Sequence, residues 1–133
     1  LAPYQPRDQL DELLSAGDCH LVSLINGAEG IMVPCKLFGV LASARPALFI
    51  GSSHSEVARI LAEEDCGVTV DQGDADALVD AIERYAECPE LLQSHGTAAR
   101  EALVRTHAAV HRCSAWEDLL YMVVEDSKQS ETE

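Results

Sequence analysis

A glycine-rich stretch between two apolar segments carries the residues of this chain that are best suited to bind an anion. Gly27 and Gly30 lie in a turn-rich segment after a short apolar run, and Pro34, Cys35 and Lys36 follow where a helix is expected to begin. Glycines let the backbone bend sharply, and proline suits the first helical position because its missing N–H needs no partner there. Backbone N–H groups at a helix start attract anions. We therefore expect a phosphate-type anion near this segment.

The distribution of charge points to the same segment. The 133 residues include 9 basic and 23 acidic side chains, which gives a formal net charge of −14. Residues 63–90 contain ten acids and one base, whereas residues 19–53 contain one acid and two bases and are locally +1. So acidic a chain repels phosphate backbones, which excludes general nucleic-acid binding. Apolar residues make up 47% of the chain, which excludes a disordered protein.

The elements that must position this segment alternate between short apolar strands and amphipathic helices. Strands are expected at residues 19–24, 47–50 and 68–70, and helices at about 7–16, 34–44, 54–65, 75–87, 89–106 and 114–124. Ser53 and Glu56 form a Ser-x-x-Glu capping box, Asp74 is expected to cap the next helix, and Pro89 to start another. This order predicts an α/β fold, a three-layer Rossmann-like parallel sheet with extra C-terminal helices. The sequence divides into a domain at residues 1–126 and a flexible acidic tail at 127–133.

The sequence gives little support for disulfide bonds or for a metal site. The five cysteines are odd in number and show no Cys-x-x-Cys spacing, so we expect reduced thiols in a cytoplasmic protein rather than disulfides. His107 and His111 lie four residues apart near Cys113, but no fourth ligand is spaced to join them, and we expect no metal site. His20 lies in an apolar strand pattern, which indicates a core histidine with a satisfied ring.

Residues 29–46 resemble the donor-site segment of GT-B glycosyltransferases. The similarity is to family 4, in the branch of bacterial cell-surface polysaccharide enzymes with a Pro-Ser-Lys-Leu-Tyr-Gly-type motif; here the motif reads Pro34-Cys35-Lys36-Leu37-Phe38-Gly39. Four further segments fit the same family: residues 3–6, 16–22 and 66–68, and the helical pair that starts at Pro89. The resemblance covers about residues 1–105.

The resemblance implies that the chain is the C-terminal half of a Rossmann-like domain that binds a UDP- or GDP-sugar, with no other cofactor. It implies a retaining glycosyltransferase that transfers a sugar to a polysaccharide or lipid-linked acceptor. Glu29 would face the donor sugar and Lys36 would stabilise the leaving diphosphate, as the two catalytic residues. The donor-binding positions would be Gly27, Gly30, Pro34, Cys35, Lys36 and Gly39.

The chain departs from the family pattern in ways that keep other functions open. Leu37 stands where the common pattern has a ribose-binding glutamate, and Gly39 stands where some members of the Pro-Ser-Lys branch carry it. Cys35 replaces the usual serine. An upstream acceptor-binding domain is expected, without which the chain is inactive, and the whole enzyme can associate peripherally with a membrane. An unpaired edge at the first strand predicts a homodimer of the isolated chain. Two alternatives remain: a non-catalytic binding or oligomerisation module, and a fragment of a GT-B-like nucleotide-sugar epimerase.

Overall fold

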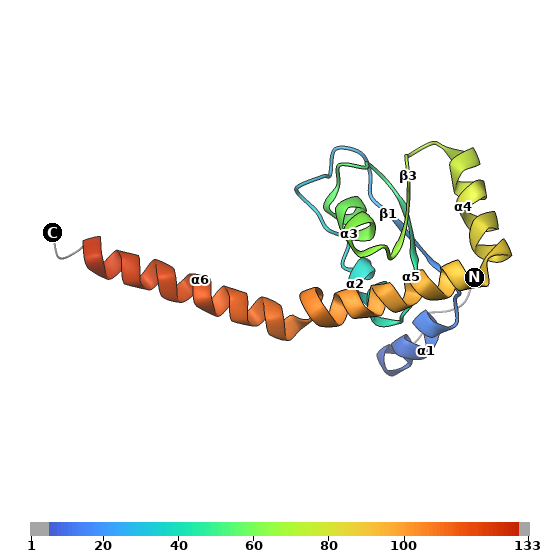
Figure 1. Ribbon diagram of the computed structural model, residues 1–133. Helices are drawn as coiled ribbons and strands as arrows, with labels where there is room; N and C mark the ends of the chain where they lie inside the picture. The colour runs from blue at the N-terminus through green and yellow to red at the C-terminus, as the bar shows by residue number, and fades with distance from the viewer. Residues whose placement is uncertain (1–5, 131–133) are drawn as a thin grey trace.

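The computed structural model describes residues 6–130 and shows an α/β domain followed by a projecting helix (Figure 1). The elements in chain order are η1 (Arg7–Gln9), α1 (Leu10–Ser15), β1 (His20–Ser23), α2 (Lys36–Ala42), β2 (Ala47–Ile50), α3 (Glu56–Glu64), β3 (Gly67–Val70), α4 (Ala75–Glu87), α5 (Pro89–Ala102), the π-helical η2 (Leu103–His107) and α6 (Ala109–Ser130). The predicted fold class and element order are therefore confirmed. The predicted domain at 1–126 and tail at 127–133 both extend into residues outside the described ones.

The sheet has three parallel strands in the order β1-β2-β3. Each strand is four residues long, and His20 pairs with Ala47, which in turn pairs with Gly67. Side chains alternate between the two faces of a strand, so Phe49 enters a core shared with α2 and α3, while Leu48 enters a second core under α4. Both faces of β2 are covered, which explains its continuous apolar sequence.

The helix starts are set by local capping, and one predicted cap was wrong. The side chain of Ser55, not Ser53, accepts the Ala58 N–H at 3.2 Å and caps α3. Asp74 caps α4 by accepting the Ala77 N–H at 3.0 Å, as predicted. The predicted start of α5 at Pro89 is confirmed as well. A serine immediately before the helix has the extended backbone that a cap requires, and Ser55 has ψ 156°.

Helix α5 crosses the amino ends of the strands and closes that side of the sheet (Figure 1). Gly96 allows the close approach, because a Cβ there would lie 2.4 Å from the Ala44 carbonyl oxygen. On the same side, the Tyr85 hydroxyl of α4 lies 2.8 Å from His95 Nδ1 of α5. Both side chains are buried, and His95 Nε2 lies 3.4 Å from a carboxylate oxygen of Asp65 at the end of α3. These contacts hold α3, α4 and α5 together.

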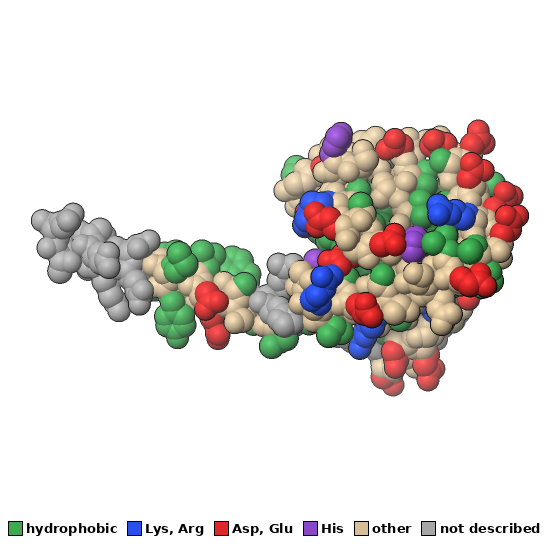
Figure 2. Space-filling view, viewed as in Figure 1, with side chains coloured by type: hydrophobic (Ala, Val, Ile, Leu, Met, Phe, Trp, Pro, Cys, Tyr) green, Lys and Arg blue, Asp and Glu red, His purple; other side chains and the backbone are tan. Residues whose placement is uncertain are grey.

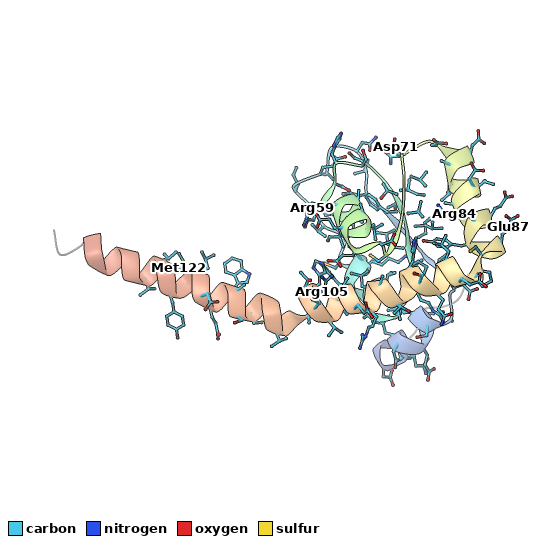
Figure 3. All side chains as sticks on the ribbon, in the orientation of Figure 1. Arg59, Asp71, Arg84, Glu87, Arg105 and Met122 are labelled. Atoms are coloured by element: carbon cyan, nitrogen blue, oxygen red, sulfur yellow. The ribbon has the colours of Figure 1, made fainter. Side chains whose placement is uncertain are left out.

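Helix α6 extends away from the domain, and its apolar side chains are exposed (Figures 1 and 2). The predicted apolar stripe of Trp116, Leu119, Leu120 and Val123 exists, but all four residues are about half exposed or more. Met122, labelled on α6 in Figure 3, is exposed as well. The helix predicted at about residues 114–124 is therefore present but longer, from Ala109 to Ser130, and its apolar stripe remains exposed. No helix within residues 6–130 is long and apolar enough to cross a bilayer.

Candidate functional site

The loops after the three strands meet at the carboxyl edge of the sheet, which is where open α/β sheets bind their ligands. The loop after β1 runs through residues 24–35, and its Asn26 N–H donates to Gln72 Oε1 of the loop after β3 at 3.4 Å. The Gly51 N–H, at the end of β2, donates to the Val70 carbonyl at 3.0 Å. The anion-binding segment predicted from the sequence therefore lies at the edge expected for a ligand site.

Two glycines shape the loop after β1. Gly27 has φ +87° and Gly30 has φ +75°, and no other atom lies within 4 Å of a Cβ built at either position. The backbone conformation, and not a lack of space, therefore requires glycine there. The Gly27 N–H donates to Glu29 Oε2 at 2.7 Å. The structure thus brings Gly27 and Glu29 together, with the carboxylate turned back onto its own loop.

The first turn of α2 follows this loop. Cys35 is the N-cap residue, but its side chain makes no capping hydrogen bond. The Leu37 N–H donates to the Pro34 carbonyl at 3.0 Å. Leu37 itself is fully buried in the core, so the position of the expected ribose-binding glutamate holds no polar group. The helix has seven residues, which limits the partial charge that its dipole supplies.

Lys36 and Gly39 make their contacts away from the centre of the loop after β1. Lys36 Nζ donates to the Leu21 carbonyl of β1 at 2.8 Å. Gly39 lies in α2 against α1, where a Cβ would meet Leu14 Cδ1 at 3.4 Å. The structure therefore places Lys36 beside the loop but already bonded, and does not bring Gly39 to the loop.

Most other cations of the domain are engaged elsewhere. Arg59 lies between Glu56 and Glu63 on α3, and Arg105 pairs with Glu64. Arg45 Nη2 donates to the Ser15 carbonyl at the end of α1 at 2.8 Å. Acidic side chains gather over α4, at the right of Figure 2. Among the described residues, Lys36 is the cation positioned beside the loop after β1.

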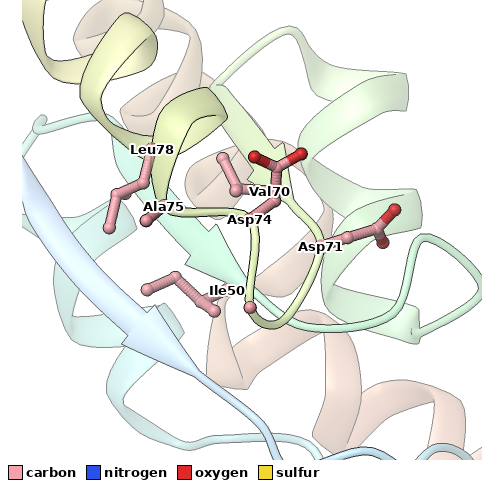
Figure 4. A pocket seen from close by; sticks show the side chains of 7 residues that line it. Ile50, Val70, Asp71, Asp74, Ala75 and Leu78 are labelled. Atoms are coloured by element: carbon pink, nitrogen blue, oxygen red, sulfur yellow. The ribbon is translucent and has the colours of Figure 1, made fainter.

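A cavity at the same edge, beside the loop after β3, was not predicted. It measures about 200 Å³ and is lined by Ile50, Val70, Asp71, Gly73, Asp74, Ala75 and Leu78 (Figure 4). The Asp74 carboxylate already caps α4, and its charge, with that of Asp71, repels phosphate. The signal in the sequence that could have indicated this cavity is its position after the second and third strands. Asp71 and Asp74 by themselves indicate only a solvated turn.

The remaining predicted features lie away from this edge. His20 Nε2 lies 2.7 Å from the Leu14 carbonyl, so the ring has a partner as predicted, but the residue is only partly buried and does not belong to the core. The His107 ring packs on Phe38, with centroids 5.8 Å apart, whereas the side chain of His111 lies outside the described residues. No group of three potential ligands lies together to hold a metal in the part of the chain that the structure describes.

The sequence of this chain is similar to those of known proteins. A family model described as glycosyl transferase-like matches residues 3–118. The putative colanic acid biosynthesis glycosyl transferase WcaI of Escherichia coli (strain K12) is 34% identical over 105 residues, which cover 78% of this chain and 25% of that protein. The chain thus spans about a quarter of the length of this relative. No solved structure matches. Because the family match covers residues 3–118 and includes β1, β2 and β3, the chain belongs to the glycosyl transferase-like family.

Proposed function

We propose that this chain is the nucleotide-sugar-binding part of a retaining glycosyltransferase of polysaccharide biosynthesis. The observation that carries the proposal is the placement of the loop after β1. This loop lies within the family match, at the carboxyl edge of a parallel sheet, in the segment with the fewest acids. A negatively charged diphosphate is least repelled there.

The residues of the loop can bind a donor in complementary ways. The positive φ angles at Gly27 and Gly30 let the backbone approach a diphosphate closely, and Lys36 supplies a cation for the charge that develops on the leaving group. Glu29 would face the donor sugar after its carboxylate releases the Gly27 N–H, from which it now accepts a hydrogen bond at 2.7 Å. Catalysis of this kind depends on positioning and charge stabilisation rather than on a protein nucleophile.

The proposal includes partners outside this chain. The donor is a UDP- or GDP-sugar, and the acceptor is a polysaccharide or a lipid-linked sugar held by an upstream domain of a cytoplasmic, peripherally membrane-associated enzyme. The isolated chain binds donor but does not turn it over. We also infer that the isolated chain forms a homodimer, because the outer edge of β1 is unpaired among the described residues.

Burial of Leu37 favours a second candidate function, a binding or oligomerisation module without catalysis. Its side chain is fully buried, so it leaves no carboxylate for a ribose at the position where the common family pattern has one. A module of this kind would keep the fold of the sheet and lose affinity for nucleotide sugars.

An amide NMR titration with UDP, GDP and their sugar conjugates tests the proposal. Donor binding is expected to shift the amides of residues 27–36, and the nucleotide with the higher affinity identifies the donor class. A Lys36→Met variant should bind more weakly, whereas Lys128→Met, which makes the same charge change on α6, should bind like the parent. Well-resolved spectra without shifts at saturating nucleotide would overturn donor binding by this chain and favour the module.

A further inference from the structure

The loop after β1 begins with a turn that presents two adjacent backbone N–H groups. The Ala28 N–H donates to the Ile25 carbonyl at 3.2 Å, and Gly27, at the third position of this turn, has φ +87°. A left-handed residue at that position is typical of a type II turn. The turn itself does not use the N–H groups of Asn26 and Gly27, and adjacent N–H groups in a turn of this kind form a concavity that binds anions.

Side-chain oxygens occupy both of these N–H groups, and one of the oxygens is charged. Gln72 Oε1, from the loop after β3, accepts the Asn26 N–H at 3.4 Å. Glu29 Oε2 accepts the Gly27 N–H at 2.7 Å, and a hydrogen bond to a carboxylate is about twice as strong as a neutral one. The Glu29 carboxylate therefore holds the N–H group that a phosphate oxygen would otherwise take.

The bond between Glu29 and Gly27 lies wholly within the loop after β1. The loop is held at its two ends by β1 and α2, and neither residue belongs to the two apolar clusters that pack on the sheet. Segments with few buried contacts rearrange at low free-energy cost. The Glu29 carboxylate can therefore exchange this bond for another without unfolding the domain.

We propose that Glu29 is a latch on the loop after β1, which selects a nucleotide sugar over a nucleotide diphosphate that has lost its sugar. A free diphosphate must compete with the carboxylate for the Gly27 N–H and is also repelled by its charge. A complete donor meets the same cost, but its sugar hydroxyls donate to the released carboxylate and offset the loss. The latch rests on the proposed function, and it makes the product of sugar transfer bind more weakly than the substrate.

Amide hydrogen exchange of the chain without ligand tests the bond on which the latch depends. In Glu29→Ala the Gly27 amide should exchange about tenfold faster, because it loses its hydrogen bond to a charged group. The Ala28 amide is the internal control, since the turn holds it and its exchange rate should stay the same. A Gly27 amide that exchanges equally fast in both chains would overturn the proposal.

Binding of inorganic pyrophosphate, followed by amide shifts, tests whether the carboxylate competes with an anion. Glu29→Ala should bind pyrophosphate about tenfold more tightly than the parent. Glu29→Gln should lie between the two, because its neutral amide oxygen still accepts the Gly27 N–H. Glu117→Ala removes an acid from the projecting α6 and should bind like the parent. Equal affinities of Glu29→Gln and Glu29→Ala would show that the carboxylate acts by charge alone, and the latch would be wrong.

A titration with nucleotide sugars tests the selection between donor and product. The quantity measured is the affinity of the conjugate that binds the parent most tightly, divided by the affinity of its free nucleotide. This ratio should fall about tenfold in Glu29→Ala, because the free nucleotide gains affinity while the conjugate also loses its contact with the carboxylate. An unchanged ratio would mean that Glu29 does not select between them.

The same measurements separate this inference from the proposed function. If nucleotides shift the loop amides but bind Glu29→Ala no more tightly than the parent, donor binding stands and the latch is wrong. If the Gly27 amide loses its protection in Glu29→Ala while neither nucleotides nor pyrophosphate shift an amide in either chain, donor binding by this chain fails, and Glu29 serves only to hold the shape of the loop.

Discussion

Replacing Gly96 with alanine should destabilise the domain strongly, although alanine favours helices. A Cβ at this position of α5 would lie 2.4 Å from the Ala44 carbonyl oxygen, whereas a comfortable carbon–oxygen contact is about 3.3 Å. The helix must therefore move by about 0.9 Å, the difference between these two distances. The carbonyl cannot easily rotate instead, because Ala44 has φ +55° and its N–H donates to the Leu41 carbonyl. Pro46 follows two residues later and is buried.

The expected loss of stability is the balance of two opposing free-energy contributions. Overpacking of this kind costs about 3 kcal/mol, and the helix propensity of alanine over glycine returns about 1 kcal/mol. The free energy of unfolding should therefore fall by about 2 kcal/mol. Gly39→Ala is the matched control, because it also lies within a helix but its Cβ would meet only the flexible end of Leu14, at 3.4 Å. That variant should gain between 0 and about 1 kcal/mol.

Urea unfolding followed by far-ultraviolet circular dichroism measures both variants. Trp116 lies on the exposed α6 and does not report on the core, so tryptophan fluorescence is the wrong probe. The slope of the transition should be unchanged, since the amount of surface exposed on unfolding stays the same. A Gly96→Ala variant as stable as Gly39→Ala would refute the close approach of α5 to the amino edge of the sheet.

Three further predictions concern buried or capping groups, each measured by urea unfolding. Tyr85→Phe leaves the buried Nδ1 of His95 without its partner and should cost about 1–2 kcal/mol, while an unchanged midpoint would show that water reaches the ring. Burial raises the pKa of the Cys66 thiol to about 12, so the folded chain keeps a proton that the unfolded chain loses above about pH 9. Stability should be full below that pH and decline above it by up to about 1.4 kcal/mol per pH unit, and Cys66→Ala should show a shallower decline. Ser55→Ala should cost about 1 kcal/mol, whereas Ser53→Ala should be neutral; the reverse order would restore the cap predicted from the sequence.

The fold could be predicted from the sequence because its signals are local and agree with one another. Apolar runs of three to six residues, separated by capped amphipathic helices, leave few arrangements other than a parallel sheet. The Asp74 cap and the start at Pro89 are set by neighbouring residues and were predicted correctly. The predicted cap at Ser53 was wrong because a cap depends on the backbone angles of the residue that precedes the helix, and these cannot be read from the sequence; the cap is Ser55.

The partners of the site residues could not be predicted in the same way. Composition indicated Glu29 and Lys36 as the charged groups of an acid-poor segment, but not that one turns to the Gly27 N–H and the other to the Leu21 carbonyl. Each of these partners is made available by tertiary or loop geometry: a left-handed glycine in one case and an unpaired strand edge in the other. The apolar periodicity likewise predicted a helix at α6 but did not predict that its apolar side chains are exposed.

The two edges of the sheet differ in a way that connects stability with function. At the amino edge, α5 approaches within contact of the backbone at Gly96, and a buried Tyr85–His95 hydrogen bond ties it to α4. At the carboxyl edge, the loop after β1 leaves Ile25, Ile31 and other apolar side chains exposed. Segments with few buried contacts open at low free-energy cost, whereas closely packed ones open only with the whole domain. Under the proposed function, the loop after β1 exchanges the contacts of Glu29 and Lys36 for those of a donor. It therefore lies where rearrangement costs least, and the closely packed amino edge keeps the strands in register.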